Sequence, residues 1–468
     1  MMEHLDELTH WLYAVKGLAE DQFAAAAAHL SDCFDCADSQ LHFGRLDAGL
    51  RELALVAGIP NVSEDPFEPS DPFRRRPRVS PRASGARKLT REESVEALEA
   101  TEHATRRSEE ILEAVKKGAA IDAILSELSI HDPTDRFALL YALQEAGRRS
   151  AENPIAIRAF GDGAVEWIRL HHASVKDVDL AERLVPGLLL RAHAHLLVAM
   201  TLLWLKEFAR ARPRLIVAYR SFARAGAGEI SFALVEHIES QRRSLSGEGA
   251  SALLLATRAR NTFESHGMED YAARATVSEG LAHCALGDHE AAVLSYRRAL
   301  PVFERHEIWS NYIGALNSTA NSLTRLGRFE EARREYARAL RRFSHEKHRY
   351  LFGYVRIGFA EALFAAGRFA DAARAAGQAE AVFEQSGLRA HQLIALLLEV
   401  ESWARSGNLH RARARLDLFR REVERDHALD RVVQTELVAA LSGTNPDYEN
   451  VSSLRRRVEG LLEERYRA

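Results

Sequence analysis

The chain has 468 residues, of which 47% are hydrophobic and 28% charged, a composition typical of a soluble globular protein. A single hydrophobic core rarely grows beyond about 250–300 residues, so several domains or one long repeat array are expected. The formal net charge of −4 excludes a global field that would steer the protein toward nucleic acid or an acidic membrane. Three cysteines are too few for a disulfide framework, which favours a reducing compartment.

The start of the chain and its most apolar stretch bear on location. Residues 1–13 are acidic and lack a basic region followed by an apolar core, so no signal peptide is predicted. The stretch 188–205 carries Arg191, His193 and His195, and it is shorter and more polar than a membrane span requires. We therefore expect a buried helix there, no membrane partner, and a cytoplasmic protein.

The motif HLSDCFDC at residues 29–36 predicts a metal site. Zinc takes four ligands, for which thiolates and imidazoles are well suited, and His29, Cys33 and Cys36 supply three. An alanine-rich helical pattern precedes the motif and a second helical pattern begins close to Cys33, so the two cysteines share a face of its first turn. The fourth ligand should come from the first helix, where His4 and His10 are available.

The surrounding residues strengthen that prediction. His4 lies 25 residues before His29, and the stretch between them resembles an L-x-x-Y-A-x-G-x-L pattern at Leu12, Tyr13, Ala14, Gly17 and Leu18. Residues 1–59 therefore resemble the zinc-containing anti-sigma domains of bacterial regulators. The resemblance implies zinc held by His4, His29, Cys33 and Cys36, with His10 as the alternative to His4, and a sigma factor as the partner. A reversible disulfide between the two cysteines, a vestigial site and coincidence remain open.

The charge of this segment is a separate indication. Residues 1–59 hold ten acidic residues against three basic ones, a net charge of −7. An acidic helical module suits a basic partner, and the promoter-binding surfaces of a sigma factor are basic because they face DNA. The same charge argues against direct nucleic-acid binding by this domain, although many small helical domains are acidic without such a partner.

Residues 60–89 form the next segment. Six of the twelve prolines lie between positions 60 and 81, among many arginines, so an extended linker is predicted, with a protease-sensitive or nucleic-acid-touching arm as the alternative. Residues 90–130 follow as charged helices, the first opened by a capping box of Thr90 and Glu93. Its apolar residues are sparse, as in a helix that finds its core only in a partner: Val95, Leu98, Ile111, Leu112 and Val115. This helix is either a fourth anti-sigma element or a spacer.

From residue 131 to 424 the sequence repeats every forty residues. Glycines recur at 247, 287, 327, 367 and 407, and an alanine follows each after five residues. An alanine twelve residues later and a phenylalanine sixteen residues later follow the first four glycines, whereas Phe419 and Val423 take these positions after the last. Glycine ends the first helix of each pair, small residues let the helices approach closely, and the aromatic fills the gap to the next pair.

The stretches 286–300 and 326–340 resemble the turn and second helix of tetratricopeptide repeats, whose usual period is 34 residues rather than 40. The resemblance implies a right-handed α-solenoid of about six to seven helix pairs. The final helices, within residues 425–468, are increasingly charged, and we expect them to cap the array. Its concave face, lined by each first helix, would bind peptides or protein segments. The polar candidates on that face are Arg274, Asn317, Asn321, Tyr354 and Glu361, together with His237 and Gln241.

No catalytic motif is present, so we expect no enzyme. The sequence predicts an all-α cytoplasmic transcription regulator, in which a zinc-binding anti-sigma domain sequesters an alternative sigma factor of the extracytoplasmic-function type. The repeat array would bind another protein or peptide that carries the signal. The alternatives are a repeat scaffold or adaptor with a purely structural zinc knob, and a regulatory subunit that a protease cuts in its linker.

Overall fold

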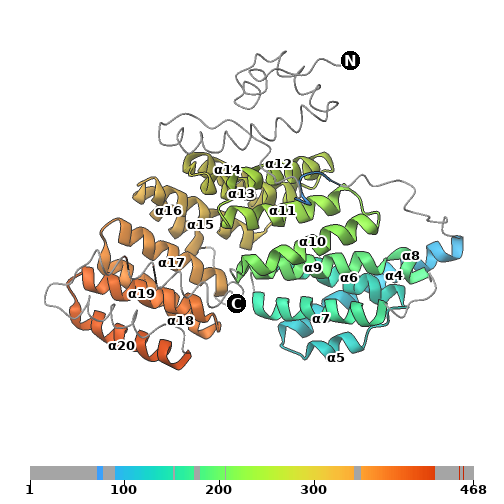
Figure 1. The fold of residues 1–468 in the computed structure, drawn as a ribbon, viewed down its shortest axis with the longest axis horizontal. Helices are drawn as coiled ribbons and strands as arrows, with labels where there is room; N and C mark the ends of the chain where they lie inside the picture. The colour runs from blue at the N-terminus through green and yellow to red at the C-terminus, as the bar shows by residue number, and fades with distance from the viewer. Residues whose placement is uncertain are drawn as a thin grey trace, which may run out of the picture. The chain divides into compact units, whose positions relative to one another are not determined.

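The computed structural model describes residues 71–76, 90–150, 153–172, 180–205, 207–341 and 349–426, together with Ser453 and Arg457. Contacts divide the chain into two compact units, residues 1–75 and 76–468. Within the described ranges the second unit forms seventeen helices, α4 to α20, and no strand (Figure 1). The predicted all-α class is therefore confirmed. The predicted segment 1–59 lies outside these ranges, as does the predicted linker 60–89 apart from residues 71–76. Of the predicted capping segment 425–468, only residues 425 and 426 and the two isolated residues are described.

Helix α4 (Arg91–Lys116) begins at the predicted capping box. The Thr90 hydroxyl accepts from the backbone N–H of Glu93 at 3.1 Å, and the Glu93 carboxylate accepts from the backbone N–H of Thr90 at 2.8 Å. Two donors left free by the first helical turn are thereby satisfied. The next helices are α5 (Ile121–Ser126), α6 (Pro133–Arg148), α7 (Pro154–His172), α8 (Leu180–Leu184), α9 (Gly187–Trp204) and α10 (Phe208–Arg224).

The packing of α4 differs from its prediction. Ile111 and Val115 are buried in one hydrophobic cluster with residues of α6, α7 and α9. The last turns of α4 therefore find their core within the array, and the expectation that they need a partner is wrong for them. At the other end, Val95 and Leu98 are 51% and 62% exposed, so the first turns of α4 keep an uncovered apolar face.

A buried arginine fixes the start of α6. The Arg136 guanidinium is fully buried, pairs with Glu182 of α8, and donates to the carbonyls of Ile130 and Val185, the latter at 2.7 Å. Three otherwise separate segments are thereby joined at one cation. Removing the cation would take this donor from two carbonyls and leave the Glu182 carboxylate without its ion-pair partner, with the Gly187 N–H as a remaining donor, which is costly in a buried setting.

From α11 onward the helices repeat with one spacing. They are α11 (Glu229–Leu245), α12 (Gly249–Ser265), α13 (Glu269–Ala285), α14 (His289–Arg305), α15 (Trp309–Arg325), α16 (Phe329–Arg341), α17 (Arg349–Ala365), α18 (Phe369–Gln385), α19 (Arg389–Arg405) and α20 (Leu409–Asp426). Each begins 20 residues after the one before, and most have 17 residues. The forty-residue period is therefore two such helices and two three-residue turns.

The turns explain the glycine period. Gly287 has a φ of 78°, in the left-handed region, and the other glycines of the forty-residue series share that conformation. A side chain is strained there, so glycine is favoured after each first helix. The turns between pairs use the same conformation at Gly267 and Gly387, whereas Glu307 occupies the equivalent position with a φ of 55°.

The small and aromatic positions of the repeat lie in the core as predicted. Ala292, Ala299 and Phe303 of α14 are at most 1% exposed. Gly280 of α13 lies against Tyr296 of α14 so closely that a Cβ atom would be 2.4 Å from the tyrosine ring. The absence of a side chain at this position is therefore what lets α13 and α14 approach each other.

The helices form two layers. Each helix from α9 to α20 packs on the next, which gives six pairs, and the first helices α11, α13, α15, α17 and α19 also contact one another in turn. These first helices form the inner layer. At its far side, Trp204 and Leu205 at the end of α9 pack against a cluster that includes Phe383 and Leu388. The array therefore curves until α9 meets its later repeats.

Helix α9 also resolves the expectation for the apolar stretch. By length and composition it is the one described helix that would suffice to cross a membrane, but 72% of it is buried inside the protein. It packs against α6, α7 and α10, with only its outer positions exposed. Its apolar character thus serves the core, as the sequence predicts for residues 188–205.

Candidate functional site

The inner layer encloses a groove, which we call the concave groove. Its main chamber has a volume of about 310 Å³ and is lined by residues of α6, α9, α10, α11, α13, α15 and α17. A second chamber of about 210 Å³ lies between α6, α9, α11 and α13. Six of the lining residues are shared by the two chambers: Gly147, Arg148, Met200, His237, Ile238 and Arg274. The two chambers therefore adjoin each other at these residues, and the main chamber has a size that suits a ligand.

The main chamber has an apolar lining and an aromatic end. Leu203, Val277 and Leu281 contribute to the apolar lining. At one end Tyr354 of α17 donates its hydroxyl to the backbone carbonyl of Trp204 at 3.4 Å. The indole N–H of Trp204 donates to the Ser150 hydroxyl at 3.2 Å. Aromatic side chains with their polar atoms satisfied give this end a rigid wall for apolar groups.

Two arginines that line the groove both lie against one tyrosine. The guanidinium carbons of Arg148 and Arg274 each lie 5.6 Å from the ring centre of Tyr271. Arg148 also donates to the Tyr271 hydroxyl at 3.2 Å and to Glu145 at 3.4 Å. Arg274 forms no ion pair within the described part of the chain, and its buried Nε has no hydrogen-bond partner there. Burial lowers the pKa of Arg274, with the charge of Arg148 adding to the effect.

Two histidines that line the groove stay neutral. Burial lowers the pKa of His237 to about 3, and the charge of Arg274 contributes. Its Nδ1 lies 3.0 Å from the Ser278 hydroxyl, and its Nε2 lies 3.3 Å from the Gln241 amide nitrogen. Burial likewise lowers the pKa of His193 to about 4. The positive charge of the groove is therefore concentrated on the two arginines.

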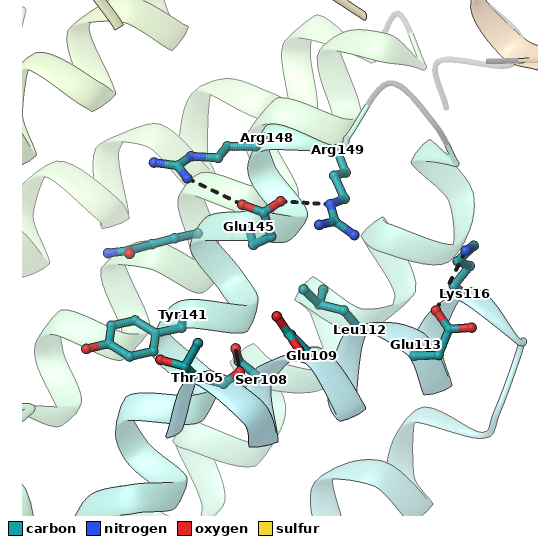
Figure 2. A pocket seen from close by; sticks show the side chains of 11 residues that line it. Thr105, Ser108, Glu109, Leu112, Glu113, Lys116, Tyr141, Glu145, Arg148 and Arg149 are labelled. Carbon is teal, nitrogen blue, oxygen red and sulfur yellow. Dashed lines mark hydrogen bonds and ion pairs between the residues drawn. The ribbon is translucent and has the colours of Figure 1, made fainter. Parts of the chain in front are cut away.

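A polar crevice between α4 and α6 adjoins the groove (Figure 2). It has a volume of about 690 Å³, and Arg148 and Gln144 line both this crevice and the second chamber. Figure 2 shows Arg148 and Arg149 converging on Glu145, which accepts from Arg149 at 2.7 Å. The crevice wall on α4 carries Glu109, Leu112 and Glu113. Arg148 thus lies where a polar crevice and an apolar groove meet.

The predicted residues of the concave face divide into two groups. Arg274 and Tyr354 line the main chamber, as do His237 and Gln241. The remaining predicted residues, Asn317, Asn321 and Glu361, line neither chamber. Asn321 accepts from the Tyr336 hydroxyl, the Asn317 side-chain oxygen is buried without a hydrogen-bond partner, and Glu361 is exposed.

The groove crosses the inner helices obliquely, which explains the division. In α11 the lining residues include Gln241 and Leu245, near the end of the helix, whereas in α15 they are Ser310 to Ser318, near its start. The same position of the repeat can therefore line the groove in one helix pair and lie outside it in another. Gly314 has the repeat position of Arg274 and Tyr354, so that spacing is the signal that would have found it.

The predicted zinc ligands lie outside the described residues. His4, His10, His29, Cys33 and Cys36 all belong to segment 1–59, for which no geometry is described. Among the residues from 71 onward that the structure does describe, no group of three histidine, cysteine or acidic side chains is arranged to hold a metal ion. Zinc therefore remains a prediction from sequence.

Comparisons with known proteins place the fold. No protein-family model matches the chain, and no curated protein matches its sequence. The crystal structure of a Rap protein complexed with Competence and Sporulation Factor is similar with a TM-score of 0.51 at 13% identity, covering 78% of this chain and 99% of that one. The apo quorum sensor NprR from B. thuringiensis gives a TM-score of 0.47 at 14% identity, over 67% and 83% of the two chains. Apo RapI gives 0.47 at 12% identity, over 68% and 85%. The likeness to the Rap protein shows a shared helical-repeat fold.

Proposed function

We propose that this protein is a regulator whose concave groove binds an extended segment of another polypeptide. The observation that carries the proposal is the pair of adjoining chambers at the inner layer, which combines an apolar lining with the cation of Arg274, for which the described residues supply no ion-pair partner. Apolar walls with a few placed polar groups are the usual features of a ligand site. The Rap protein that shares this fold was crystallised with Competence and Sporulation Factor, which supports the same use of the fold here. The proposal assigns the chain no reaction of its own and a cytoplasmic location.

Hydrogen exchange tests this proposal. Peptides are first selected from a random display library on the full-length protein. The amides of α11, α13 and α15 are then followed with and without a selected peptide. Binding in the groove predicts slower exchange in these three inner helices and little change in the outer helices α12, α14 and α16. Protection confined to the outer helices, or no selectable peptide, would contradict the proposal.

A second function is favoured by the amino-terminal sequence. We propose that His4, His29, Cys33 and Cys36 hold zinc, with His10 as the alternative to His4, and that segment 1–59 sequesters an alternative sigma factor of the extracytoplasmic-function type. Bound zinc would tie two short helices together at a corner too small to have a core of its own. The exposed face of α4 formed by Val95 and Leu98 supports a partner near this segment in sequence.

Metal analysis of the full chain tests the zinc site. The wild type should carry one zinc per chain, and the double variant Cys33→Ala with Cys36→Ala should carry none. Loss of metal in His4→Ala but not in His10→Ala would assign the fourth ligand. A sigma factor that co-purifies with the wild type and not with the double variant supports the anti-sigma role. Partners that persist in the double variant favour the scaffold, and one discrete cut between residues 60 and 89 favours the protease-regulated subunit.

A further inference from the structure

The guanidinium of Arg274, which has no ion-pair partner among the described residues, indicates the charge of the segment that the groove binds. Arg148 shares Glu145 with Arg149, whereas Arg274 has no carboxylate within ion-pair distance in the described ranges. Asp270 and Glu145 act on Arg274 only as more distant charges. A partly buried cation that has no carboxylate partner is costly, and a carboxylate supplied by a ligand would offset that cost.

The neighbours of Arg274 sharpen the charge preference. His237 and His193 are neutral hydrogen-bonding groups at physiological pH, so they neither repel a cation strongly nor attract an anion. Arg148 and Arg274 stay charged, both lie 5.6 Å from the ring centre of Tyr271 and both line the two chambers, so an anionic group entering the groove meets two donors with planar, forked geometry. Arginine pairs with carboxylates through two parallel hydrogen bonds, which makes this arrangement suited to a carboxylate.

The position of the arginines within the groove indicates an internal residue. Arg148 lines the polar crevice and both chambers of the groove, so these cavities meet at this residue. A chain terminus placed at this residue would extend into only one of them. In the main chamber, Leu203, Val277 and Leu281 provide an apolar lining beside Arg274 and Trp204. A segment that extends from the polar crevice along the arginines into the main chamber would place its acidic residue at the arginines and an apolar side chain in the main chamber.

We infer that the groove takes a polypeptide segment with an internal Asp or Glu paired with Arg274 and Arg148 and with an apolar side chain beside it. This inference rests on the proposed peptide-binding function and names the class of segment. A carboxylate that pairs with a guanidinium in such a site should bind roughly tenfold to a hundredfold more tightly than the amide of the same shape. The amide keeps the shape of the acidic side chain and removes only its charge.

Peptide pools test the inference on the full-length protein. The pools are acetylated and amidated hexapeptides with Asp, Asn, Lys or Leu at the third position and a mixture of Leu, Val, Phe, Ser and Asn elsewhere. A further pool has Asn at the third position and a free carboxyl terminus. The retained amount of each pool on immobilised protein is measured by mass spectrometry. The inference predicts that the Asp pool is retained at least tenfold over the Asn pool.

Variants locate that preference. Arg274→Met should bring the Asp and Asn pools to equal retention, and Arg274→Lys should keep part of the preference because it keeps the charge. Arg334→Met, the same change at an exposed arginine of α16 outside the groove, is the matched control and should behave as wild type. Circular dichroism melting of Arg274→Met and Arg274→Lys separates a lost preference from a lost fold.

The outcomes separate the inference from the proposed function. Equal retention of all capped pools by the wild type, with loss in Gly314→Trp, would overturn the carboxylate preference and leave peptide binding in place. A preference for the free-carboxyl pool would overturn the internal position. An Asp preference that persists in Arg274→Met would overturn the assignment to Arg274. Retention of no pool, or retention indifferent to Gly314→Trp, would contradict peptide binding in the groove itself.

Discussion

Gly280 provides a quantitative test of how the repeat packs. In Gly280→Ala the new Cβ would lie 2.4, 2.7 and 2.9 Å from three atoms of the Tyr296 ring. That ring is 1% exposed, and its hydroxyl lies 3.5 Å from the Cys284 sulfur, so it has little room to move. Forcing extra volume into a well-packed core costs about 1–3 kcal/mol, and contacts this short belong to the upper part of that range.

The helix propensity of alanine offsets part of this cost. Replacing glycine by alanine inside a helix contributes about 1 kcal/mol of stability, so the net loss for Gly280→Ala is about 2 kcal/mol. Gly314 of α15 is the matched control, because a Cβ there has no atom within 4 Å. Gly314→Ala should therefore gain about 1 kcal/mol.

Hydrogen exchange measured by mass spectrometry on the full chain resolves the stability difference between the two variants helix by helix. Repeat arrays open in segments, so a loss at the α13–α14 interface appears first in those two helices. A loss of about 2 kcal/mol predicts exchange roughly 30-fold faster in α13 and α14 of Gly280→Ala. Gly314→Ala should slow exchange in α15. Unchanged or slower exchange in Gly280→Ala would refute the close-approach explanation of the small residue.

Three further predictions follow from buried charge, titration and backbone strain. Arg136→Met should lower the unfolding free energy by about 3–5 kcal/mol in urea denaturation, because Glu182 loses its buried partner. The depressed pKa values of His237 and His193, about 3 and about 4, mean that the unfolded chain binds more protons below about pH 6.5. Urea titrations should therefore show stability falling by about 1.4 kcal/mol per pH unit per histidine from pH 6.5 to 4, and less steeply in His237→Gln. Glu307→Gly should stabilise the chain by about 1 kcal/mol and raise its melting temperature, because it relieves a left-handed φ of 55°.

The fold was predictable because its determinants are local and repeated. Gly287 and its equivalents mark each turn after a first helix from α11 onward, and the buried series of Ala292, Ala299 and Phe303 marks the second helix α14, as its equivalents do in α12 and α18. The helix lengths and turns follow from that spacing alone. The turn at Glu307 carries no such signal in the sequence, since the glycine that the same conformation favours elsewhere is absent there.

The groove was predictable only in part, because its path depends on how each pair is rotated against the next. Arg274 and Tyr354 line it, but Asn317 does not, although it has the repeat position of His237. The rotation between pairs accumulates from side-chain packing and leaves no mark in the period. Arg148 lies on α6, upstream of the strict repeat, so no spacing pointed to it.

The most direct test of peptide binding in the groove is a titration with one peptide selected on the wild-type protein. Wild type, Gly314→Ala and Gly314→Trp are compared by fluorescence anisotropy at full length. The open space beside Gly314 admits a bulky side chain that fills the groove without displacing the fold. Gly314→Ala should bind like wild type, and Gly314→Trp should bind at least tenfold more weakly at an unchanged melting temperature. Equal affinity of wild type and Gly314→Trp would contradict the assignment of the concave groove as the binding site.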